Sequence, residues 1–396
     1  MASLTRARGL SPSVVLFLSL FAAQAAILVL SPILPQVAAE FGVTTSTAAQ
    51  LRAVSGVTAG LVALLVAARG GRFPLIRLLN WGLGLLAIGA LASAAAPTFV
   101  ILLVAQVPVG LGLALVLSSG LAAADAWSDP GEGAKTLSWA LVGQPVAWIV
   151  GQPVVGAVAS VDWRWTWVVV PLTSAIVAMV AVAMRQRSTT GELEGCDPVG
   201  LIRLPHVKNW VVGELMAFSA WAGTLVFAGA FFIETYDPSV GATGVILGVV
   251  AAVYVPGNFL GRRLLQRGPG RGVLLVSALS LAVGAVVLAG LQIGLVFSVV
   301  ILSVLGFLAG MRTIAGASVG LRLADGRRLA SMSVRTSTLQ FGYLIGTLVG
   351  GLVLPIWGYA GVWLVYAALF AGAGIVHMRR HPVLADDLVA QSSGDG

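Results

Sequence analysis

Residues 143–156 read GQPVAWIVGQPVVG and lie in the middle of a long apolar segment. Gly143, Ala147 and Gly151 recur every four residues, so on a helix they form one smooth stripe that another backbone can approach closely. Both prolines remove an amide donor and bend such a helix, and neighbouring helices must accommodate the bend. The stretch therefore predicts a bent helix packed tightly inside a membrane.

A second stripe of small residues occurs in FGYLIGTLVGG and consists of Gly342, Gly346, Gly350 and Gly351; Gly346 follows Gly151 by 195 residues. Gly350 continues this stripe one helical turn further on. Because one stripe occurs in each half of the chain, we expect two similar helix bundles that meet along their stripes.

The composition is that of a membrane protein. Of the 396 residues, 58% are hydrophobic and only 10% are charged, and the mean hydropathy is +0.98. A soluble chain carries about a quarter of charged residues, so the main solvent of this chain is the lipid bilayer. The net charge of +8 is spread over the ends of apolar segments, which argues against a nucleic-acid partner. The single cysteine, Cys196, excludes an intramolecular disulfide and a cysteine-based metal site.

A spanning helix needs about 20 mostly apolar residues. Twelve segments satisfy this rule: 14–34, 47–68, 74–95, 98–122, 136–158, 164–184, 209–233, 242–263, 272–290, 293–321, 332–354 and 358–377. The first resembles a signal peptide, but because many spans follow it we expect an uncleaved first helix. The predicted fold is an all-α integral membrane protein with two parallel six-helix repeats. The predicted parts are a first bundle (1–184), a cytoplasmic linker (185–208), a second bundle (209–377) and a cytoplasmic tail (378–396).

The positive charges predict the orientation. Most of the 23 Lys and Arg residues fall on one side if the N-terminus is inside the cell. The positive-inside rule therefore predicts a multi-pass plasma-membrane protein with both termini in the cytoplasm. Trp163, Trp165 and Trp167 then lie at the outer interface, where indole rings are enriched.

Short motifs add a family resemblance. In the loop after the second span, Arg69, Gly71 and Arg72 take positions of the signature GxLaDrxGrr. Pro153 and Gly156 match a signature around GPxxGG in the fifth span. With its twelve spans, the chain resembles the major facilitator superfamily over nearly its whole length, and most closely the 12-helix drug/proton antiporter branch. The resemblance implies alternating access between two six-helix halves.

The sequence also departs from these signatures. Ala68 stands where the loop signature has Asp, and Gln152 replaces a glycine of the fifth-span signature. The fourth span matches RxxQG through Gly110, but Gln106 stands where the family has Arg. The resemblance implies an ionic contact between this cytoplasmic loop and the eleventh span, and an Arg in the fourth span that takes part in proton coupling. Both lack a residue here, so proton coupling would need other groups. The residues expected to act in gating or conformational change are Arg52, Arg69, Gly71, Arg72, Gly143, Gly151, Pro153, Gly156, Gly346 and Gly350.

Ionisable residues at membrane depth need a reason, because each costs about 2.5–3.5 kcal/mol to insert. Arg312 is the deepest charge, and it either pairs structurally or binds an anionic group in the central cavity. Glu214 is the one carboxylate well inside a predicted span, roughly 6 Å from Arg312 in depth. We expect the two to meet, either as a structural pair or as a proton-coupling site. Asp125 is a second proton-coupling candidate, or simply a solvated helix end.

Arg52 lies early in the second predicted span with no partner there. It either extends to the membrane interface or closes an outer gate with Glu40, Glu234 or Asp237.

Five neutral side chains are candidates for the wall of a substrate cavity, either as ligand contacts or as packing: Gln24, Gln106, Gln144, Trp148 and Trp221. Amides inside a bundle need partners, and a ligand can supply one. Together with Arg312, these residues predict a largely apolar solute with a few polar groups.

No catalytic or phosphate-binding motif is present, so we expect neither an enzyme nor an ATP-driven pump, and no cofactor or metal. The predicted function is secondary active transport by a monomer that exports small amphipathic molecules, such as drugs or antibiotics, in exchange for protons. One alternative is uptake or facilitated transport of a small metabolite, with Arg312 as the countercharge if the metabolite is anionic. The other is a polytopic receptor or membrane-embedded enzyme.

Overall fold

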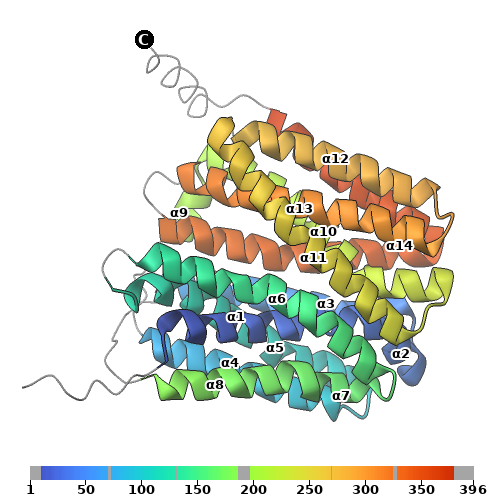
Figure 1. Cartoon of the computed structure of the whole chain (residues 1–396), viewed down its shortest axis with the longest axis horizontal. Coiled ribbons are helices and arrows are strands. Elements are labelled where there is room, and N and C mark those ends of the chain that lie inside the picture. Colours follow the sequence, from blue (N-terminus) through green and yellow to red (C-terminus); the bar gives the residue numbers. More distant parts are fainter. Residues whose placement is uncertain are drawn as a thin grey trace, which may run out of the picture.

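The computed structural model describes residues 10–69, 73–129, 132–185, 197–268, 270–323 and 328–378. Its helices lie side by side in one long bundle (Figure 1). They are α1 (Pro12–Leu28), α2 (Leu30–Phe41), α3 (Thr45–Arg69), α4 (Leu75–Ala94), α5 (Phe99–Ala126), α6 (Gly133–Ala159), α7 (Trp163–Trp167), the π-helix η2 (Val168–Leu172), α8 (Thr173–Met184), α9 (Pro198–Ile202), α10 (Pro205–Tyr236), α11 (Val240–Arg267), α12 (Gly270–Gly290), α13 (Leu295–Leu323) and α14 (Arg328–Met378). We call the end at which α1 begins the near end, and the end at which α2 finishes the far end.

Eleven helical stretches in the described part of the chain are long and apolar enough to cross a membrane. The last of them contains two spans, because Gly358 inside α14 has φ 60° and ψ −165°, a conformation that essentially only glycine adopts. After Gly358 the chain returns to the near end, where Arg271 donates to the carbonyl groups of His377 and Met378. The predicted all-α fold with twelve spans is confirmed.

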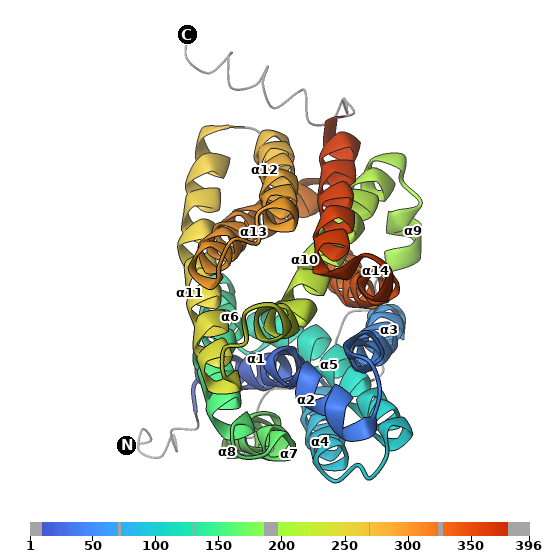
Figure 2. The same ribbon diagram turned by 90° about the vertical axis from the view of Figure 1, so that its right-hand side faces the viewer.

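The first and second halves of the chain form two groups of helices. In Figure 1, α1 to α8 lie below α10 and α12 to α14, while α11 runs down beside α6; Figure 2 shows the same division from the far end. One apolar core joins both halves from the middle to the far end; it includes Leu34 of α2 and Phe231 of α10. Toward the near end, the core around Leu78 belongs almost wholly to the first half and the core around Trp210 to the second. The halves are therefore packed together at the far end.

Helix α2 continues α1 past two prolines, so the first span is longer than predicted. Pro32 has no amide hydrogen to donate to the carbonyl of Leu28 one turn earlier. The side chain of Gln152, on α6, donates to that carbonyl instead, at 3.1 Å. This is how the neighbouring helix accommodates the break, as buried backbone groups in a membrane require.

A close crossing joins the two halves near the far end. Pro35 leaves the carbonyl group of Ser31 without its helical donor, and Gly229 of α10 lies against this carbonyl. A Cβ atom at Gly229 would overlap the Ser31 oxygen and would lie 2.8 Å from Cα of Pro32. The amide of Gly229 also donates to the Ser31 hydroxyl at 3.3 Å. Glycine is therefore required for the halves to approach this closely.

Most residues of the two stripes do not join the halves, so the expectation that the bundles meet along these stripes was wrong except at Gly351. Gly143 lies against the backbone of Phe17, and Gly151 against the side chain of Leu28, both in the first half. A four-residue spacing identifies one face of a helix but not the helix that it meets.

The second stripe behaves in the same way. Gly346 lies against the backbone of Ser219 and Gly223 of α10, and Gly350 against the side chain of Phe227. All five of these residues belong to the second half.

Contacts to the opposite half come from Gly156, which follows the first stripe, and from Gly351, the last glycine of the second stripe. A Cβ atom on Gly156 would lie 2.8 Å from the carbonyl oxygen of Val240, and one on Gly351 would lie 3.2 Å from that of Ser46. These two glycines are again 195 residues apart, so the two repeats contact each other in equivalent ways.

Candidate functional site

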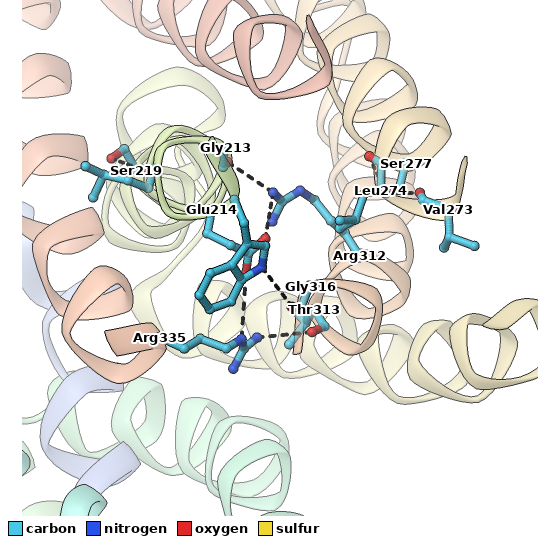
Figure 3. Close-up of polar contacts among 12 residues, drawn as sticks. Gly213, Glu214, Ser219, Val273, Leu274, Ser277, Arg312, Thr313, Gly316 and Arg335 are labelled. Atoms are coloured by element: carbon cyan, nitrogen blue, oxygen red, sulfur yellow. Dashed lines mark hydrogen bonds and ion pairs between the residues drawn. The ribbon is translucent and has the colours of Figure 1, made fainter. Parts of the chain in front are cut away.

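Three helices of the second half bring a carboxylate and two guanidinium groups together. Glu214 of α10 is 1% exposed. Its Oε1 lies 2.9 Å from Nη2 of Arg312 on α13, and its Oε2 lies 3.7 Å from Nε of Arg335 on α14. Figure 3 shows Glu214 between the two arginines. The contact expected between Glu214 and Arg312 is present, and the cluster carries one positive charge in excess.

Two glycines of α13 make room for this cluster. A Cβ atom at Gly316 would lie 2.5 Å and 2.6 Å from the two carboxylate oxygens of Glu214. One turn further on, Gly320 lies against the indole ring of Trp210, whose Nε1 donates to the carbonyl of Gly316 at 3.0 Å. Small residues four apart therefore form a groove in α13 for two large side chains of α10.

Backbone carbonyls supply further acceptors for both arginines. Nη2 of Arg312 donates to the carbonyl of Gly213, and Nη2 of Arg335 donates to that of Thr313, each at 3.1 Å (Figure 3). The Nε atoms of both arginines have no hydrogen-bond partner within the described residues. The hydrogen-bonding capacity of the cluster is therefore not exhausted.

An apolar wall adjoins the cluster. The rings of Trp221 and Tyr254 are stacked, with centroids 6.4 Å apart. Tyr254 also lies near all three charged residues of the cluster. A small pocket is lined by Ala217, Phe218, Trp221, Leu281, Ala309, Arg312, Thr313 and Phe370. Trp221 and Arg312, both predicted cavity residues, line this pocket together.

Arg52 of α3 is 1% exposed and lies between the two halves. Its Nη1 donates to the Ser55 hydroxyl at 2.7 Å, and its Nη2 donates to Oε1 of Gln340 on α14 at 2.9 Å. Its guanidinium carbon lies 3.8 Å from the centre of the Tyr343 ring. Arg52 thus joins α3 to α14 through neutral groups.

Two of the three acids proposed for an outer gate, Glu40 and Glu234, have other partners. Glu40 pairs with Arg164 at 2.6 Å, and Glu234 accepts hydrogen bonds from Thr45 at 2.5 Å and Tyr359 at 2.9 Å. The predicted pairing of Arg52 with one of these acids is therefore wrong. Glu234 does link the halves, but its partner in the first half is Thr45, because both lie at the far end.

The sequence matches the family model of the Major Facilitator Superfamily over residues 16–311 and 210–392. The chain belongs to the major facilitator superfamily. Members of this superfamily are multi-pass transporters of small solutes, so the expectation of a transporter rather than an enzyme is confirmed at this level. No curated protein matches the sequence of this superfamily member.

Solved structures of superfamily members share the fold. A D-xylose–proton symporter has a TM-score of 0.74 at 13% identity, over 94% of this chain and 98% of its own. A bacterial homologue of the human lysosomal transporter Spinster, in an inward-facing and unoccupied conformation, has a TM-score of 0.72 at 15% identity, over 94% and 98%. Its occupied inward-facing form has a TM-score of 0.73 at 15% identity, over 96% of each chain.

The glutamines of this transporter lie in different surroundings. Gln24 accepts a hydrogen bond from the indole nitrogen of Trp148 at 3.0 Å, and this bond joins α1 to α6. Gln144 is half-buried on α6. Gln106 is fully buried and donates to Ser93 of α4 at 3.0 Å, inside the first half. Gln106 therefore packs inside the first half, which is the alternative to a place in the cavity wall, and its Oε1 has no hydrogen-bond partner among the described residues.

The remaining predictions concern the loop after α3 and the last turn of α5. Arg69 is exposed at the end of α3. Gly71, Arg72 and the side chain of Asp125 fall outside the residues that the structure describes.

Sequence reasoning missed Arg335 and Gln340. Arg335 lies only seven residues from the start of α14, among basic residues attributed to the cytoplasmic edge. Gln340 follows in the same apolar helix. Its position five residues after Arg335 was a usable signal, because a polar residue at that depth needs a partner.

Proposed function

We propose that this transporter couples the movement of a small solute to protons, with Glu214 as the proton site. The observation that supports the proposal is the burial of Glu214 between two arginines. Among the described residues it is the one acidic side chain that is buried. Ionisable groups inside a membrane are rare and mark ion or proton pathways.

The chemistry rests on the separation of these charges. A carboxylate in low-dielectric surroundings keeps its charge while a cation stays beside it. If α14 moves relative to α10 during the transport cycle, Arg335 leaves Glu214. With only Arg312 beside it instead of two cations, the carboxylate takes up a proton more readily. The charged and titratable side chains around Glu214 are Arg312, Arg335, Tyr254 and, beside Gly213, His377.

The arrangement of the halves supports alternating access. They share one core at the far end and have largely separate cores at the near end. We propose that the near end and both termini face the cytoplasm, as the positive charges predict. The conformation described here would then be closed to the outside.

Proteoliposome transport tests the proposal. An imposed pH gradient should drive solute accumulation by the wild type, while Glu214→Gln should lose accumulation at least tenfold and keep energy-independent solute exchange. Glu132→Gln is the matched control, because Glu132 has an exposed side chain near the near end of α6. Normal gradient-driven accumulation by Glu214→Gln would refute the proposal.

A second candidate is export of amphipathic compounds such as drugs or antibiotics in exchange for protons, as the motif resemblance implied. The stacked rings of Trp221 and Tyr254 beside the ionic cluster favour a solute with an apolar body. Overexpression should then lower the accumulation of amphipathic dyes in cells. Unchanged or higher accumulation of every dye would contradict export.

A further inference from the structure

The interior of the transporter holds more positive than negative charge. Arg52, Arg312 and Arg335 lie at membrane depth, whereas Glu214 is the one buried acid among the described residues. A buried charge without a counterion costs several kcal/mol. A membrane protein that retains such cations needs an anion to offset them, and a solute can supply it.

Arg335 is the least satisfied member of the ionic cluster. Arg312 makes a close ion pair with Glu214 at 2.9 Å, but Nε of Arg335 is 3.7 Å from the carboxylate, beyond hydrogen-bond distance. One of its five N–H donors is used by the carbonyl of Thr313. Its side chain is 13% exposed, against 5% for Arg312 and 1% for Glu214. Arg335 is therefore the more exposed of the two cations in the cluster.

The position of Arg335 suits a solute that enters between the halves. Six residues further along α14, Phe341 contacts Gly60 of the first half. Arg335 lies on the near-end side of this contact, toward the region in which the two halves have largely separate cores. The ring of Phe218 lies 5.7 Å from its guanidinium carbon and offers an apolar surface beside the charge.

We infer that the transported solute is an organic monoanion, and that Arg335 binds its carboxylate. This inference rests on the proposed function and names the solute of the same site. The planar guanidinium of arginine suits the two oxygens of a carboxylate. The apolar body of the solute lies against Phe218. A cationic solute would add a third positive charge beside two arginines, which excludes that class.

The same geometry fixes the sign of proton coupling. Ionised Glu214 and the solute carboxylate compete for Arg335. Protonation of Glu214 removes that competitor and strengthens anion binding, and reciprocally the bound anion favours the protonated acid. Proton and anion therefore bind together and move in the same direction, as in a symporter.

Binding is tested first, with the full-length protein in detergent. The probes are three sets of compounds. Each set has one apolar body, which is phenyl, indole or octyl, and carries a carboxylate, an amide or an amine as its head group. The phenyl set consists of 3-phenylpropionate and the corresponding amide and amine. We expect carboxylates alone to raise the melting temperature. Arg335→Gln should weaken their binding roughly 10- to 100-fold, and Arg335→Lys should weaken it less because the charge remains.

Arg262→Gln is the control, because Arg262 is an exposed arginine on α11 toward the near end of the same half. Stabilisation by the amines, equal carboxylate binding by Arg335→Gln, or no carboxylate binding at all would each overturn the inference. The best-binding carboxylate is then tested for transport. Symport is supported if a lower pH on the side to which the carboxylate is added drives its accumulation on the other side of the membrane. Transport that ignores the pH gradient would refute the proposed proton coupling while leaving the anion site intact.

Discussion

Replacing Gly229 with alanine should open the far end of the transporter. Gly229 lies against the Ser31 carbonyl where α10 of the second half crosses α2 of the first. The added methyl group would overlap backbone atoms, which cannot rotate away as a side chain can. The present conformation, in which the far end is closed, is therefore destabilised relative to one in which these helices separate.

The size of the effect follows from the overlap. The new Cβ would lie 2.8 Å from Cα of Pro32, whereas ordinary contact begins at 3.4 Å, so the helices must separate by about 0.6 Å or more. Overpacking of this kind costs about 1–3 kcal/mol. A cost of 2 kcal/mol shifts the conformational equilibrium roughly 30-fold toward the open far end.

The matched control has the same overlap inside one half. A Cβ atom on Gly346 would lie 2.8 Å from the amide nitrogen of Gly223, and both residues belong to the second half. Gly346→Ala should therefore lower the amount of folded protein without opening the far end. The pair separates an effect on conformation from an effect on stability.

A reporter thiol measures the opening. Ser46→Cys, in a Cys196→Ser background, places a thiol at the far end of α3, where Ser46 is 8% exposed and faces Gly351 of the other half. A soluble maleimide should label it at least tenfold faster with Gly229→Ala than without. Unchanged labelling, or an equal increase with Gly346→Ala, would refute the reasoning.

Three further predictions follow from single contacts. Gln152→Leu leaves the Leu28 carbonyl without a donor and should lower the free energy of unfolding by about 1–3 kcal/mol, whereas Gln144→Leu on the same helix should change it little in the same denaturation assay. Gly316→Ala brings a methyl group against the Glu214 carboxylate and should reduce gradient-driven transport at least tenfold in protein that still inserts; full transport would show that the cluster tolerates displacement. Tags at both termini should be accessible only from the cytoplasm, and an impermeant thiol reagent outside intact cells should not label Cys196.

The number of spans and the ionic pair were predictable from the sequence. The length of each apolar segment determines whether it can cross a bilayer, and this gave the twelve spans. Counting 1.5 Å per residue from the helix ends placed Glu214 and Arg312 at similar depths, and they are 2.9 Å apart. Both inferences depend only on distances along single helices, and these distances follow directly from the number of residues.

Contacts across helices were harder to predict. The spacing of Gly151 and Gly346 showed that each lies in a close crossing, but not that the crossing is with a helix of the same half. Arg52 was matched to acids by charge, whereas its actual partners are a hydroxyl, an amide and an aromatic ring. Pairing positive with negative residues in the sequence cannot identify neutral partners. Which neighbouring helix a residue contacts depends on how the helices pack.

Helix α14 connects the interface between the halves to the ionic cluster. Gln340 binds Arg52 of the first half, and Arg335, five residues earlier on α14, faces Glu214. These positions are about 7.5 Å apart along a continuous helix. When the halves separate at the far end, the Arg52–Gln340 bond must break, and a helix that tilts or rotates at Gln340 also moves at Arg335. The contact that determines whether Glu214 has one cationic neighbour or two is therefore mechanically linked to the interface that opens. If Glu214 is the proton site, as we propose, proton uptake and the change in access occur together because one rigid element takes part in both.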